Sequence, residues 1–125
     1  MATVLRRSSE GTLLEDPDLA VGLASETEDF DQAFRLVHDQ YNWRGYMAPA
    51  PSGRRLMVHN ALPTTKVFVA RRGRHVAGTV TVVQDSLFGL PLDDLYRAEV
   101  AAIRRDEHRI AEVVALATAA GSRRT

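Results

Sequence analysis

The most constraining feature of the sequence is a pair of apolar segments separated by a short polar turn. Residues 66–71 predict one strand, residues 72–74 (Arg-Gly-Arg) predict the turn, and residues 75–85 predict a second strand. Two such strands joined through a glycine-containing turn form an antiparallel hairpin. The second segment is apolar or small on both alternating faces: Val76, Gly78, Val80 and Val82 on one, and Ala77, Thr79, Thr81 and Val83 on the other. We therefore expect it to lie inside a sheet that is covered on both sides.

Segments before and after the hairpin extend it into an α+β domain. Residues 19–24 and 109–118 predict a first and a last strand. Residues 25–44 predict a helix, with a capping box formed by Ser25 and Glu28. A second helix is predicted to begin at Pro91, with an apolar stripe of Leu92, Leu95, Tyr96, Val100 and Ile103. This order predicts a mixed, largely antiparallel sheet flanked by helices.

The pattern divides the chain into three parts. Residues 1–18 are polar and predict a flexible leader, residues 19–118 predict the folded domain, and residues 119–125 predict a tail. The connection over residues 46–64 is long for a compact domain, and such connections are either binding loops or lids, or plain insertions. The length of the connection alone does not distinguish between these two interpretations.

Composition excludes several classes of function. The formal net charge is zero, which gives no electrostatic support for nucleic-acid binding. No apolar run reaches the roughly 20 residues of a membrane span. Without cysteine the chain has neither disulfides nor a thiol nucleophile, and the spacing of its four histidines does not predict a metal site. These observations fit a cytoplasmic protein.

Glu112 is the most informative residue for chemistry. In the predicted last strand it shares a face with Ile110, Val114 and Leu116, so its carboxylate lies among apolar side chains. Burial raises the pKa of a carboxyl group, as a general base working at neutral pH requires. A structural ion pair with an arginine explains the same pattern equally well.

Three other positions have a functional and a structural interpretation. Asp85 ends the central strand, where it can orient an amine or an arginine, or cap the turn that follows. Arg35 lies four residues from both Asp31 and Asp39, the spacing of a surface ion pair. Arg54 and its neighbour Arg55 can bind a carboxylate through two hydrogen bonds, or remain solvated in the long loop.

Several short segments form a pattern through their order and spacing. They are Phe34-Arg-Leu-Val-His38 to Tyr41, Arg44-Gly-Tyr-Met47, Ala61-Leu-Pro-Thr-Thr65, Val67-Phe-Val-Ala70, Val76-Ala-Gly-Thr79, Gln84-Asp-Ser86, Gly89-Leu-Pro-Leu-Asp93, Tyr96 and Ala111-Glu-Val-Val-Ala-Leu-Ala117. Taken together, these segments resemble the N-acyl amino acid synthases of the GNAT acyltransferase superfamily, which are related to acyl-homoserine lactone synthases. The resemblance covers roughly residues 19–118.

The resemblance implies transfer of a fatty acyl group from an acyl-carrier protein or acyl-CoA thioester to the amine of an amino acid. The thioester is then a co-substrate, and no cofactor is bound permanently. Glu112 would deprotonate the amine, directly or through water. The long loop with Tyr46 would close over the acceptor, Arg54 would hold its carboxylate, and Asp85 and Arg35 would shape the acceptor side.

The sequence departs from the GNAT pattern after the strand that carries Glu112. In GNAT domains a turn that binds the donor, a helix and further strands follow, whereas here residues 119–125 follow directly. We therefore expect a chain that resembles the N-terminal half of the fold. Truncation, completion by another chain, and self-association through the exposed last strand are the three expected outcomes. A non-catalytic interaction module or a remnant is the alternative to an enzyme.

Overall fold

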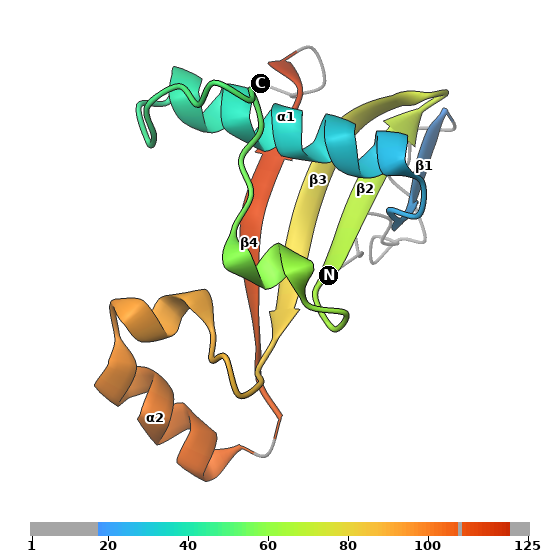
Figure 1. The fold of residues 1–125 in the computed structure, drawn as a ribbon. Helices are drawn as coiled ribbons and strands as arrows, with labels where there is room; N and C mark the ends of the chain where they lie inside the picture. Colours follow the sequence, from blue (N-terminus) through green and yellow to red (C-terminus); the bar gives the residue numbers. More distant parts are fainter. Residues whose placement is uncertain (1–17, 108, 121–125) are drawn as a thin grey trace, which may run out of the picture.

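The computed structural model describes residues 18–107 and 109–120 (Figure 1). The predicted leader and tail lie almost entirely outside these residues. The elements, in chain order, are β1 (Leu19–Leu23), α1 (Thr27–Trp43), the 3₁₀ turn η1 (Val58–Ala61), β2 (Lys66–Arg72), β3 (His75–Gln84), the 3₁₀ turn η2 (Pro91–Asp94), α2 (Arg97–Asp106) and β4 (Ala111–Thr118).

The four strands form one sheet in the order β1-β2-β3-β4, and every neighbouring pair is antiparallel. This confirms the predicted α+β class and the hairpin of β2 and β3. Gly73 has a φ of 61° in the turn between them, a left-handed conformation that glycine adopts without a steric penalty. The four strands follow one another in space as they do in sequence, so the chain builds the sheet as a meander interrupted by α1 and by the segment of residues 85–110.

Helix α1 lies across one face of the sheet (Figure 1). Its apolar side packs into a core of Ala33, Val67, Val69 and Val76, with Phe30 and Phe34 against it. The opposite face has an apolar hollow of about 260 Å³, bordered by residues such as Phe68, Val80 and Val113. The described residues that line this hollow all belong to the strands, so no described helix covers this face there, where the sequence predicted cover on both sides.

The predicted cap of α1 is wrong by one residue. The N-cap is Glu26 rather than Ser25, and the acidic partner is Asp29 rather than Glu28. The Asp29 carboxylate accepts the amides of Ser25 and Glu26, both at 3.2 Å, and also binds Arg71 of β2. The acidic residue that caps the helix is thus the one that also binds β2. The local sequence around the helix start contains no information on that contact.

Irregular pairing changes which side chains share a face. Ala115 has a φ of 54°, and the register between β3 and β4 shifts between Thr79 and Thr81. One extra residue in β4 places Leu116 on the face of Val113, and Ala117 on the face of Val114. The predicted shared face of Glu112 and Leu116 is therefore wrong, because strict alternation fails at a bulge.

A second shift occurs where Arg71 of β2 pairs with Val76 of β3. It turns Val76 toward α1, into the core with Val67 and Val69. The predicted shared face of Val76 and Gly78 is therefore also wrong.

The segment after β3 was predicted as one helix and is two. Residues 91–94 form η2, a break follows at Leu95 and Tyr96, and α2 begins at Arg97. Of the predicted stripe only Val100 is buried, in a second core with Val83 and Leu90, whereas Leu95 is 78% exposed. The predicted stripe is wrong because the break changes the helical phase between Leu92 and Val100.

Candidate active site

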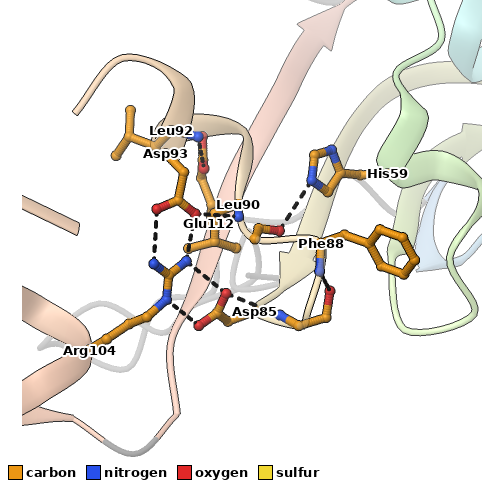
Figure 2. Close-up of polar contacts among 10 residues, drawn as sticks. His59, Asp85, Phe88, Leu90, Leu92, Asp93, Arg104 and Glu112 are labelled. Carbon is orange, nitrogen blue, oxygen red and sulfur yellow. Dashed lines mark hydrogen bonds and ion pairs between the residues drawn. The ribbon is translucent and has the colours of Figure 1, made fainter. Parts of the chain in front are cut away.

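Glu112 lies on β4, beside the segment that contains η2 (Figure 2). Its side chain is half-buried, and Oε1 accepts the backbone amide of Leu92 at 2.8 Å. The partner is thus a peptide group, where the structural interpretation expected an arginine. The amide fixes one carboxylate oxygen at the start of η2, so the position of Glu112 depends on the packing of that turn.

A hollow of about 280 Å³ lies next to Glu112. Most of its wall is apolar, with one cation and one carboxylate. The lining residues are Tyr41, Arg55, Met57, Pro91, Leu92, Leu95, Glu112, Val114 and Ala115. A largely apolar hollow with few polar groups is the usual form of a small-molecule site. Helix α1, the long loop, η2 and β4 all contribute to it.

Arg55 provides the cation of this hollow. Its guanidinium carbon lies 5.1 Å from the centre of the Tyr41 ring, and its backbone amide donates to the Phe34 carbonyl oxygen at 3.0 Å. Tyr41 also packs edge-on against Tyr46, with 5.5 Å between the ring centres. The long loop is therefore attached to α1 at this point, through a hydrogen bond and a cation–π contact.

The predicted residues Arg35 and Arg54 share one partner outside the hollow. Nε of Arg35 lies 3.0 Å from one oxygen of Asp31, and Nε of Arg54 lies 2.5 Å from the other. The hydrogen bonds from Arg54 and Arg35 hold the pKa of Asp31 below its ordinary value. Arg54 therefore attaches the long loop to α1, whereas the ion pair of Arg35 with Asp31 lies within α1. Asp39, the other expected partner of Arg35, contacts His38.

Tyr46 is 66% exposed and borders a different hollow of about 300 Å³. Tyr41 lines this hollow as well, together with Leu116 and Thr118 of β4. The Tyr41 ring, which lines both hollows, thus lies between Tyr46 and the Glu112 hollow.

Asp85, the last predicted site residue, binds Arg104 of α2 through both carboxylate oxygens, at 2.6 and 2.8 Å (Figure 2). Arg104 also binds both oxygens of Asp93, at 2.9 and 2.5 Å. Hydrogen bonds from Arg104 lower the pKa of Asp85, and together with the Leu90 amide they lower the pKa of Asp93 to about 2. We call these three residues the Arg104 clamp.

The capping predicted for Asp85 also occurs, because the Ser86 amide donates to Oδ1 at 3.0 Å. Sequence reasoning missed the clamp itself. In the sequence, Arg104 lies near the end of the predicted helix and Asp93 near its start, where each charge is favourable with the helix dipole alone. Arg104 and Asp93 are 11 residues apart, and because η2 and α2 are separate elements, helical periodicity does not relate their positions. The sequence spacing therefore does not predict this contact.

Among the described residues, no group of three or more His, Cys, Asp or Glu side chains could hold a metal ion. His38 is buried and accepts the Ala50 amide at 3.0 Å, whereas His59 contacts the Gly89 carbonyl oxygen at 3.2 Å. Both attach the long loop to neighbouring elements. Within the same residues, no helix is both long and apolar enough to cross a membrane.

Comparison with known proteins gives a match to a family profile and to a solved structure. The sequence profile of FeeM, described as N-acyl amino acid synthase FeeM, matches residues 32–125. The structure of FeeM, an N-acyl amino acid synthase from uncultured soil microbes, superposes with a TM-score of 0.72 and 26% sequence identity. The match covers 85% of this chain and 56% of that structure. A search of curated proteins gave no match.

Proposed function

The chain belongs to the FeeM family of N-acyl amino acid synthases, and on that premise we propose that it transfers a fatty acyl group from a thioester to the amine of an amino acid. The chain spans 56% of the length of the FeeM structure, so the complete activity is part of this proposal. The proposed donor is an acyl-carrier protein or acyl-CoA. Because these thioesters are cytoplasmic molecules, the cytoplasm is the proposed compartment.

The observation that carries the proposal is the position of Glu112 at the rim of a largely apolar hollow. An acceptor amine reacts only after losing a proton, and a carboxylate within reach can accept that proton. Oε1 of Glu112 is held by the Leu92 amide, which fixes the orientation of the group. We assign the role of base to this carboxylate.

The proposed reaction is a simple acyl exchange. The amine nitrogen attacks the thioester carbonyl carbon, a C–N bond forms and the C–S bond breaks. The proton from the amine passes to Glu112, and the sulfur of the donor leaves as a thiol after taking up a proton. In this proposal Arg54 holds the long loop on α1 through Asp31, the residue that Arg35 also binds. Asp85 holds α2 at the end of β3 through Arg104, and Tyr46 packs against Tyr41.

The test is acyl transfer by the purified chain. Dodecanoyl-CoA and dodecanoyl-acyl carrier protein are each incubated with the twenty amino acids, and N-acyl products are measured by mass spectrometry. Glu112→Gln is expected to lower the rate by about 10²- to 10⁴-fold, the usual contribution of a general base. The glutamine oxygen can still accept the Leu92 amide, so the fold is retained.

Glu99→Gln is the matched control, because Glu99 is an exposed glutamate on α2. It should keep the unmodified rate. An absence of product with both donors, or a fully active Glu112→Gln protein, would rule out the proposed reaction.

One observation favours the non-catalytic alternative, a module that binds another chain. β4 is an edge of the sheet formed by the described residues, and it exposes Val113 and Leu116 by 56% and 68%. An exposed apolar edge strand pairs readily with a second chain. Self-association through β4 predicts a dimer in light scattering that Leu116→Lys dissociates, and a monomer in the unmodified protein would refute it.

A further inference from the structure

We propose that Arg55 binds the carboxylate of the acceptor and thereby restricts acceptors to amino acids over simple amines. This inference rests on the proposed function, because it takes the Glu112 hollow as the acceptor site. Arg55 and Glu112 line the same hollow of about 280 Å³, and the rest of its wall is largely apolar. A guanidinium at the edge of such a hollow can bind an anionic group through charge-assisted hydrogen bonds.

Four other arginines in the described part of the chain bind aspartate carboxylates. Arg71 binds Asp29, Arg104 binds Asp85 and Asp93, and both Arg35 and Arg54 bind Asp31. The guanidinium of Arg55 instead packs on the face of the Tyr41 ring. The carboxylate-binding role that the sequence resemblance gave to Arg54 therefore suits its neighbour better.

The surroundings of Arg55 hold its guanidinium in a defined place. The backbone amide is bonded to the Phe34 carbonyl oxygen, and the ring under the guanidinium is braced by Tyr46. The N–H groups of a guanidinium lie in its own plane. When its face packs on an aromatic ring, these groups therefore remain available to bind a carboxylate through two parallel hydrogen bonds. Little side-chain freedom is lost when a ligand binds a group held in this way.

The two charged groups of the hollow match those of an amino acid. An α-amino acid carries its carboxylate and its amine on one carbon atom. With the carboxylate on Arg55, the amine is directed to the same hollow that Glu112 borders. An amine that lacks a carboxylate loses the first contact and leaves the cation of Arg55 without a partner, which weakens its binding.

The test compares acceptors that differ only in the carboxylate. Neutral amino acids and their primary amides are given to the unmodified protein, Arg55→Met, Arg55→Lys and Arg54→Met. Binding is measured as the shift in thermal midpoint, and acylation as kcat and KM with dodecanoyl-CoA and dodecanoyl-acyl carrier protein. Because the amide lowers the basicity of the amine, the quantity compared is the change caused by each substitution.

Arg55→Met should raise the KM for amino acids by about 10- to 100-fold, the usual effect of losing hydrogen bonds to a charged group. Its kcat and its KM for the amides should stay nearly constant, and Arg55→Lys should restore part of the affinity. Arg54→Met should leave the ratio of amino acid to amide unchanged, because Arg54 binds Asp31.

The outcomes separate this inference from the proposed function. If product forms but Arg55→Met keeps the preference for amino acids, the role of Arg55 is refuted and the synthase activity stands. If no product forms, but amino acids raise the midpoint of the unmodified protein and not of Arg55→Met, the carboxylate site stands and the reaction fails. A protein that does not distinguish amino acids from amides by either measurement refutes the inference.

Discussion

Gly89 lies in the tight connection between β3 and η2. Its φ is 73°, and a Cβ atom built on it would lie 2.8 Å from Oδ2 of Asp93. That oxygen accepts the Leu90 amide at 2.6 Å and also binds Arg104. The carboxylate is held from two sides, so it cannot move away from a new side chain.

Gly89→Ala is therefore expected to destabilise the protein by at least about 1 kcal/mol, from the left-handed conformation alone. The displaced Asp93 carboxylate adds to this effect. Gly22→Ala is the control, since a Cβ atom at Gly22 meets nothing within 4 Å and the residue lies in a strand. Urea unfolding measures both, and equal stabilities would contradict the packing described for Gly89.

At the scale of elements, the Arg104 clamp joins α2 to the end of β3 and to η2. Figure 1 shows η2 and α2 beyond one end of the sheet, away from α1. The segment is also attached through the core of Val83, Leu90 and Val100, the hydrogen bond from Leu92 to Glu112, and the contact of His59 with the Gly89 carbonyl oxygen. This segment thus has few contacts with the rest of the protein, and its stability depends strongly on one side chain.

Arg104→Met should loosen residues 86–107 while the sheet stays folded. Hydrogen exchange is expected to become faster in α2 and η2 and to stay unchanged in β2 and β3, because local opening releases only the contacts of that segment. Arg105→Met is the control, since Arg105 is the exposed neighbour. Uniformly faster exchange throughout the chain would show that the clamp supports the whole fold instead.

Local patterns predicted the elements well and their contacts poorly. The strands of the hairpin and the last strand were predicted from short apolar segments, and α1 corresponds to the helix predicted over residues 25–44. Bulges escaped prediction because one inserted residue leaves the composition unchanged. Glu112 borders a largely apolar hollow, whereas its contact with the Leu92 amide depends on tertiary packing that no local pattern predicts. Its role as a base stays a prediction.

At the scale of the whole molecule, four aspartates join separate elements through arginines. Asp29 links α1 to β2, Asp31 links α1 to the long loop, and Asp85 and Asp93 are both held by α2. Hydrogen bonds from Arg71, Arg54 or Arg104 are the largest cause of the lowered pKa of each aspartate. The folded chain therefore binds fewer protons than the unfolded chain in acid.

The thermal midpoint should consequently fall as the solution is acidified. An aspartate with a lowered folded pKa stabilises the protein above its unfolded pKa of about 3.9, and this stabilisation is lost as the pH falls through the folded pKa. For Asp93 the folded value is about 2, so its contribution disappears between roughly pH 5 and pH 2. Calorimetry over this range measures the slope.

Asp93→Asn should reduce the slope of midpoint against pH, because it removes one of the four groups. Asp94→Asn serves as the control, since Asp94 is the exposed neighbour of Asp93. Equal slopes for both variants and the unmodified protein would show that the Arg104 clamp does not contribute to the acid sensitivity.

The bulge at Ala115, where φ is positive, shifts the alternation of side chains along β4 by one residue. Up to Val114 the even-numbered side chains face α1, and after it the odd-numbered Ala117 takes their place. A scan of lysine substitutions along the strand should therefore be harmful at Val114, tolerated at Val113 and Leu116, and harmful again at Ala117. Alignments of distant relatives that assume uninterrupted alternation will pair the wrong residues downstream of this point.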